Sequence, residues 1–101
     1  MNKSTSLRNK YKREYKSWEC MHSRCRNKND TGYKYYGGRG IKIVKRWNSF
    51  ENFLKDMGRR PEYHTLDRKN CYGNYSKRNC RWLHVMLQSR NQRKTDNYNR
   101  I

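Results

Sequence analysis

The sequence predicts a small α+β domain, because two amphipathic helical patterns precede two short strand patterns and a last helical stretch. A chain of 101 residues fits one domain with a limited core. Only 32% of the residues are apolar, so the nine Tyr and three Trp must supply much of the core volume. We expect a flexible segment over residues 1–6, a single domain over 7–94 and a polar tail over 95–101.

The first helix is predicted over about residues 7–26, where apolar side chains recur every three or four positions and the opposite face is basic. Turn-forming residues follow at 27–32. The segment 35–40 then carries three glycines in four positions, which indicates positive φ angles or a close approach of the backbone to another group. We therefore treat 35–40 as a candidate contact loop.

A short strand and a second helix are predicted next. The β-branched alternation of residues 41–44 is typical of a strand. Asn48 as N-cap, with Glu51 three residues later, predicts the start of a helix with an apolar stripe. Gly58 and Pro61 predict its end.

The last third of the domain has the layout of a strand–turn–strand hairpin followed by a helix. Strands are predicted over 64–68 and 80–83, with a turn at about 70–75 and a helix at about 85–94. This is the part of the chain on which the functional interpretation depends.

The charge of the chain predicts a polyanionic partner. Lys and Arg number 26 against 8 Asp and Glu, which gives a formal charge of +18. The basic residues are interleaved with Tyr, Trp and Asn, which favours a folded nucleic-acid-binding surface over a solvated basic face. No apolar run approaches the roughly 20 residues of a membrane span, and the first residues lack the apolar stretch of a signal peptide. We expect an intracellular protein with no membrane partner.

The four cysteines admit a zinc site or free thiols. Cys20 with Cys25 and Cys71 with Cys80 could form a four-thiolate structural zinc site. However, the chain has no Cys-x-x-Cys, and a five-residue step on a helix turns by about 500°, which separates the first pair. We favour free thiols and keep structural zinc as the alternative.

Six short motifs occur in order along the chain, at residues 15–25, 35–41, 56–61, 66–68, 73–75 and 79–82. Together they resemble the ββα-metal (HNH) nuclease superfamily, and more narrowly its small phage and prophage HNH-like proteins. The resemblance covers about residues 15–93. It implies a hairpin and helix that hold one divalent ion, Mg²⁺ or Mn²⁺, over a scissile phosphate.

The resemblance also implies roles for four residues. Asp67 takes the place of the acidic metal ligand, and Asn79 takes the place of the Asn that holds the hairpin. Arg68 stands where the superfamily has its histidine base, and arginine stays protonated near neutral pH and cannot be a base. Gln88 replaces the ligand on the helix, keeping a carbonyl oxygen that suits Mg²⁺ but no charge.

Some restriction enzymes of the superfamily carry Asp-Arg at this place and use a tyrosine before the hairpin. By that resemblance Tyr36 would be the nucleophile or activate water, and Arg68 would stabilise the charge on the phosphate. Tyr35 and His64 are rival bases. A packed aromatic for Tyr36 and a surface or hydrogen-bonded histidine for His64 remain the structural alternatives.

Basic residues near the hairpin are the expected nucleic-acid contacts. The chosen surface consists of Arg39, Lys42, Lys45, Arg46, Arg90, Arg93 and Lys94. The basic face of the first helix is a further candidate clamp on the phosphate backbone. Double-stranded DNA is the expected partner, while stacking of Tyr and Trp on unpaired bases keeps single strands and RNA open.

The expected function is therefore a phage-encoded, Mg²⁺-dependent endonuclease that nicks or cuts DNA in the cytoplasm of a bacterial host. Arg68 and Gln88 differ from the residue types that the superfamily has at these positions. They motivate an alternative function, that of a catalytically inactive HNH-fold DNA-binding protein or an inhibitor of a host nucleic-acid enzyme. A third possible function is that of a basic structural protein in an RNA–protein particle, and only the charge of the chain supports it. A homodimer is left open, since a monomer would nick one strand and a dimer could cut both.

Overall fold

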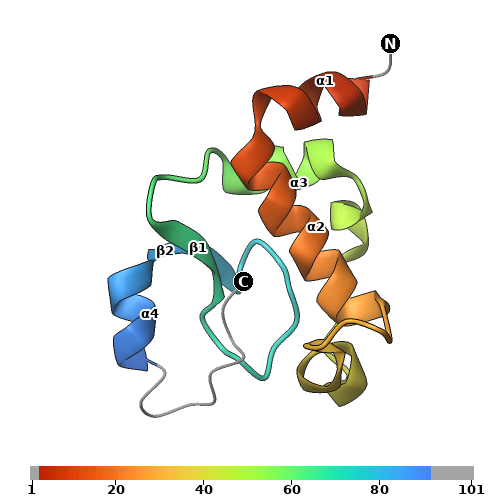
Figure 1. The fold of residues 1–101 in the computed structure, drawn as a ribbon, viewed down its shortest axis with the longest axis vertical. Helices are drawn as coiled ribbons and strands as arrows, with labels where there is room; N and C mark the ends of the chain where they lie inside the picture. The colour runs from red at the N-terminus through yellow and green to blue at the C-terminus, as the bar shows by residue number, and fades with distance from the viewer. Residues whose placement is uncertain (1–2, 92–101) are drawn as a thin grey trace.

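A computed structural model of the chain describes residues 3–91, with the side chains of residues 7–88. The elements in order are α1 (Lys3–Lys10), α2 (Lys12–Arg26), α3 (Phe50–Met57), β1 (His64–Arg68), β2 (Cys80–His84) and α4 (Val85–Asn91), as Figure 1 shows. Three short 3-10 turns, Tyr33–Tyr35, Gly37–Arg39 and Lys45–Asn48, connect α2 to α3. The predicted small α+β class is confirmed in its coarse form, a two-stranded antiparallel sheet with helices around it.

The hairpin forms where the sequence predicts it. β1 and β2 pair in antiparallel register, with His64 opposite His84 and Arg68 opposite Cys80. α4 begins directly after β2. The end of the predicted helix 85–94 lies outside the described residues.

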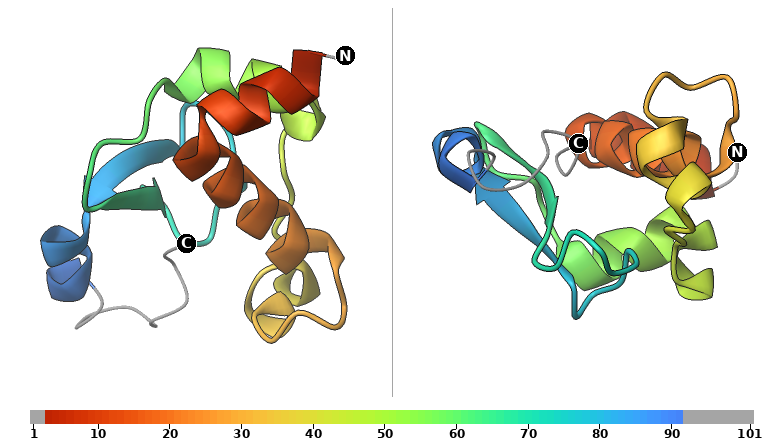
Figure 2. Two further views of the ribbon diagram at one scale, coloured as in Figure 1. Left: turned by 45° about the horizontal axis from the view of Figure 1, so that its top comes forward. Right: turned by 90° about the horizontal axis from the view of Figure 1, so that it is seen from below.

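The predicted first helix is divided in two at Tyr11. This residue has φ −122° and ψ 60°, and the chain changes direction there (Figures 1 and 2). The helical hydrogen bonds from Tyr11 N to Leu7 O and from Tyr15 N to Tyr11 O persist across the change, at 2.8 and 2.9 Å. Leu7, before the bend, and Tyr11, at the bend, both pack against the core. The helix also begins at Lys3, before the predicted start.

The predicted strand at 41–44 is wrong. Ile43 makes only an isolated parallel bridge to Tyr75. Tyr75 N donates to Lys42 O, and Val44 N donates to Tyr75 O, both at 2.9 Å. A 3-10 turn begins at Lys45, so the ladder cannot extend. The alternation reflects the burial of Ile41 and Ile43 in the core, with Lys42 and Val44 exposed, and not a full strand.

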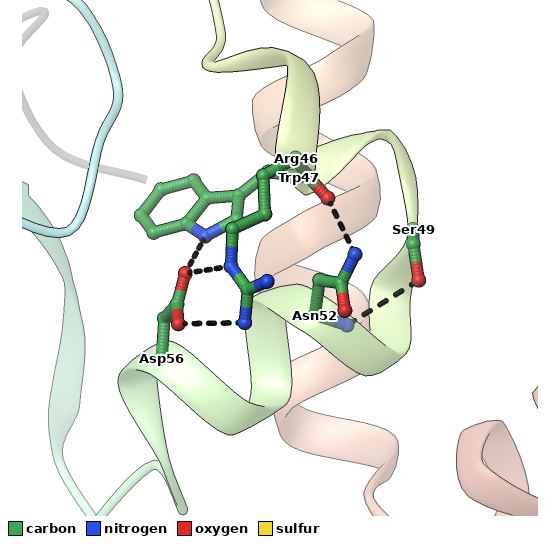
Figure 3. Close-up of polar contacts among 5 residues, drawn as sticks. All are labelled: Arg46, Trp47, Ser49, Asn52 and Asp56. Atoms are coloured by element: carbon green, nitrogen blue, oxygen red, sulfur yellow. Dashed lines mark hydrogen bonds and ion pairs between the residues drawn. The ribbon is translucent and has the colours of Figure 1, made fainter.

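The N-cap of α3 is Ser49 and not Asn48. Ser49 Oγ accepts the backbone N–H of Asn52 at 3.3 Å (Figure 3). Asn48 Oδ1 instead accepts a hydrogen bond from Arg26 at 2.6 Å, so the predicted capping pair with Glu51 does not form. Gly58 is the C-cap as predicted, with φ 69°.

Aromatic side chains fill the core, as the composition predicts. Trp47 and Phe53 are fully buried, and their rings pack edge to face with centroids 4.9 Å apart. Tyr36 and Tyr75 join the same cluster with Leu66 of β1. The core therefore lies between α2, α3 and one face of the hairpin.

Asp56 of α3 ties the 3-10 turn before α3 to the helix (Figure 3). Its carboxylate accepts from Arg46 Nε at 2.9 Å and from the guanidinium NH2 at 3.1 Å. Its Oδ2 also accepts from the indole Nε1 of Trp47 at 2.8 Å. The hydrogen bond from Arg46 lowers the pKa of Asp56 below its ordinary 3.8. A buried indole thus depends on a surface ion pair for its acceptor.

Replacing Asp56 with Ala should lower the free energy of unfolding by about 1–3 kcal/mol, because it orphans the buried indole donor. Asp56→Asn keeps an acceptor and should cost less. Because the folded pKa lies below 3.8, the ionic contribution is present above that value and disappears as the pH falls through the folded pKa. Urea unfolding at about pH 7 and about pH 3 checks this. A difference between wild type and Asp56→Asn that does not shrink at the lower pH would contradict it.

Candidate functional site

The hairpin presents two faces with different surroundings. Leu66 and Arg68 point to one face and Thr65 and Asp67 to the other, because side chains alternate along a strand. Leu66 belongs to the aromatic core cluster. Leu83, the cross-strand partner of Thr65, is buried but lies outside that cluster. α4 follows β2 and contacts it (Figures 1 and 2), so we infer that α4 covers the face that carries Thr65 and Asp67.

Buried oxygen atoms occur at Thr65 and Asp67 on this face of the hairpin and at Gln88 on α4. Asp67 is 3% exposed, and its Oδ2 accepts from Arg81 Nε at 3.0 Å. Burial raises the pKa of the Asp67 carboxyl, and the hydrogen bond from Arg81 only partly offsets this. On α4, Gln88 is 2% exposed, and neither end of its amide has a hydrogen-bond partner in the described part of the chain. The buried Oγ1 of Thr65 also has none there.

Buried polar atoms without a hydrogen-bond partner are rare in folded proteins, and each one indicates an additional partner such as a water molecule or an ion. The carboxylate of Asp67, the amide oxygen of Gln88 and the hydroxyl of Thr65 are the hard oxygen ligands that Mg²⁺ prefers. Among residues 7–88, no three or more His, Cys, Asp or Glu side chains gather in a way that could hold a metal ion. By their chemistry, these three oxygen donors would suit an Mg²⁺ or Mn²⁺ ion that keeps several waters.

Arg68 lies on the opposite face from Asp67. It is 3% exposed, and its guanidinium lies 5.1 Å from the ring centre of Tyr36 and 5.0 Å from that of Tyr75. Its NH1 donates to the carbonyl of Gly73 at 2.9 Å. Arg68 is therefore a core cation held beside two rings, and this placement does not suit the expected contact with a phosphate near Asp67.

Tyr36 accompanies Arg68, as the resemblance implies, but inside the core. The ring is 1% exposed and stacks on Tyr75 with centroids 6.4 Å apart. Arg24 lies 5.6 Å from its centre on α2. A nucleophile must reach the phosphorus atom, so this burial favours the packed-aromatic alternative for Tyr36. Tyr35 is half-buried beside the same cluster.

His64 stands at the far end of β1 from Asp67, about 10 Å along the strand. Its ring lies 5.2 Å from that of His84, and its Nδ1 is 2.8 Å from the carbonyl of Glu62. The structure thus does not bring this rival base to Asp67. His84 is itself hydrogen-bonded: its Nδ1 accepts the backbone N–H of Met86 at 3.2 Å and caps α4.

Asn79 holds the long connection between the strands. Its Nδ2 donates to the carbonyls of Asn70 and Asn74 at 3.1 and 2.9 Å. Its Oδ1 accepts the N–H of Asn70 at 3.0 Å. The side chain therefore positions the loop, which is the task that the resemblance implies for it.

The predicted nucleic-acid contacts are only partly described. Arg39, Lys42 and Lys45 are exposed, and Arg39 lies over the exposed ring of Tyr72 at 5.8 Å. Arg46 is engaged by Asp56, which makes it a weaker candidate for phosphate. The side chain of Arg90 lies outside the described residues, as do Arg93 and Lys94.

The four cysteines are free thiols in the structure. Burial raises the pKa of Cys25 to about 11 and that of Cys80 to about 12. Zinc needs thiolates, so these two positions in the apolar core are poor ligands. Cys20 and Cys71 are half-buried.

No helix in residues 3–91 is long and apolar enough to cross a membrane. No family model matches the chain, and no curated protein or solved structure matches it. Its function must therefore be argued from its own residues.

Proposed function

We propose that this chain is an endonuclease that uses Mg²⁺ or Mn²⁺ to hydrolyse phosphodiester bonds of DNA on the α4 side of its hairpin. The observation that carries the proposal is the set of buried oxygen atoms, with a carboxylate at Asp67 and orphaned acceptors at Gln88 and Thr65. The charge of +18 supplies the attraction for a phosphate backbone.

Asp67 and Gln88 would hold the metal ion, with Thr65 as an additional oxygen. When bound, such an ion polarises the phosphate and lowers the pKa of bound water. This chemistry suits a site in which neither Arg68 nor Tyr36 lies on the α4 side.

Arg81 takes the role that the resemblance gave to Arg68. It is the cross-strand partner of Asp67 and lies on the same face. Its side chain is 44% exposed, so its guanidinium can reach a phosphate from solvent. A cation bound to Asp67 would weaken the Asp67–Arg81 ion pair and release Arg81 for the charge that develops on the phosphate.

A second candidate is a nucleic-acid-binding protein that shares the hairpin but does not hydrolyse its ligand. The burial of Arg68 against Tyr36 and Tyr75 favours it, because the residue at the superfamily base position then serves the core. The same basic surface would bind DNA in both cases.

Nicking of supercoiled plasmid with Mg²⁺ or Mn²⁺ distinguishes the two candidates. We expect Asp67→Ala to lower the nicking rate by at least about 100-fold. Loss of a residue that only supports a metal ligand costs up to about 100-fold, and loss of a direct ligand should cost no less. Glu62→Ala, an exposed acidic residue, is the matched control and should nick like wild type. Gel shifts in EDTA should be similar for all three proteins.

Equal nicking rates for wild type and Asp67→Ala would refute the proposed site. Binding without nicking by any of the three proteins would support the second candidate instead. Circular dichroism of each variant verifies that the fold is retained.

A further inference from the structure

A cavity of about 300 Å³ lies where α1 meets α2. Four basic side chains line it together with Tyr11 and Glu14: Lys10, Lys12, Arg13 and Arg59. Arg59 arrives from the segment after α3, so the cavity joins two parts of the chain. The break in the predicted first helix thus creates a basic hollow that a straight helix would lack.

The positive charge of this cavity is only partly neutralised within the described residues. Among residues 7–88, none of the four cations forms an ion pair. Glu14 is 4% exposed, its Oε2 accepts the backbone N–H of Arg60 at 2.6 Å, and its carboxylate offsets one of the four positive charges. Lys10 and Arg59 both lie near the ring of Tyr11, at 5.6 and 5.3 Å from its centre. A concentration of positive charge around one cavity favours a bound anion.

We propose that this cavity binds a phosphate of the nucleic-acid backbone, which rests on the proposed nucleic-acid partner of the hairpin. The mixture of Arg and Lys donors around a small hollow suits a phosphodiester. The α1–α2 junction and α4 lie far apart in every view (Figures 1 and 2). The cavity is therefore a second anchor along the polynucleotide, separate from the α4 side of the hairpin.

The test measures binding and not cleavage, so that it does not depend on the metal site. The double variant Lys12→Gln/Arg59→Gln removes two charges and keeps the aliphatic stems. Lys28→Gln/Lys34→Gln removes two exposed charges outside the cavity and is the matched control. Fluorescence anisotropy in EDTA with a labelled duplex of about 20 base pairs is recorded over a salt series.

We expect the cavity variant to bind at least about 10-fold more weakly at low salt and to reduce the salt slope by about one for each lost phosphate contact. The control should change the slope less. Equal effects of the two variants would overturn the inference, because they would show diffuse attraction only. Saturable binding of AMP or inorganic phosphate that is lost in the cavity variant, with an unchanged duplex slope, would overturn it in favour of a free phosphate ligand.

The failures of the two proposals differ. Wild-type protein that does not bind the duplex at low salt would refute both the nucleic-acid partner and the anchor. Wild-type binding with the same salt slope in the cavity variant would refute the anchor alone.

Discussion

Replacing Arg68 with Ala is expected to lower the free energy of unfolding by about 3–5 kcal/mol, the largest effect we predict for any side chain. Arg68 is 3% exposed, and its guanidinium packs beside the stacked pair Tyr36 and Tyr75. Its removal leaves a cavity next to two rings and takes the donor from the carbonyl of Gly73. Urea unfolding measures the change.

Two further variants separate the shape of Arg68 from its charge. Arg68→Lys keeps the charge but loses the planar group that stacks on both rings, so it should recover only part of the stability. Arg68→Met keeps much of the volume and avoids the burial of a charge, so it should be less destabilising than Arg68→Ala. Lys69→Ala, the exposed neighbour, should stay within about 0.5 kcal/mol of wild type. A loss below about 1 kcal/mol in Arg68→Ala would contradict a core role.

The folded Arg68→Met protein also tests the assignment of roles at the hairpin. If Arg81 and not Arg68 serves the phosphate, this variant should nick plasmid at a rate close to wild type. If Arg68→Met keeps its fold but loses as much nicking activity as Asp67→Ala, Arg68 takes part in the reaction.

The local signals in the sequence were sufficient for the hairpin and for α3. The strand pattern of 64–68, the turn residues and the stop at Gly58 act over short distances, and the structure agrees with them. The prediction of a strand at 41–44 failed because the pairing of this segment depends on Tyr75, which lies far along the chain. The break at Tyr11 likewise depends on packing of that ring and on Arg59. Neither contact has a signature in the local sequence.

The candidate site was predictable only in part. Asp67 and Gln88 are both buried, and burial of a helix Gln cannot be deduced from its residue type. The prediction that Arg68 and Asp67 act on the same phosphate conflicts with the geometry of a β-strand. Neighbours on a strand point to opposite faces, so a regular strand through 64–68 already separates the two side chains. The role that we propose for Arg81 follows from the same rule combined with the register, which pairs Arg81 with Asp67.

Gly37→Ala is expected to destabilise the protein by about 3 kcal/mol or more, because a backbone atom blocks the new methyl group. A Cβ at this position would overlap the carbonyl oxygen of Cys25 and come within 2.5 Å of Tyr33 Cε2. The carbonyl belongs to the last turns of α2 and cannot move without unwinding that helix. Such a loss should be visible as a large fall in the urea midpoint.

Gly40→Ala is the matched control in the same loop. Gly40 has φ 85°, yet a Cβ there would meet nothing within 4 Å. Its cost should be about 1 kcal/mol, from the left-handed backbone alone. The glycine-rich segment was expected to approach something closely, and the approach at Gly37 is to α2 of the same molecule. If Gly37→Ala folded as well as Gly40→Ala and lost DNA binding instead, the loop would be a ligand contact and not a packing device.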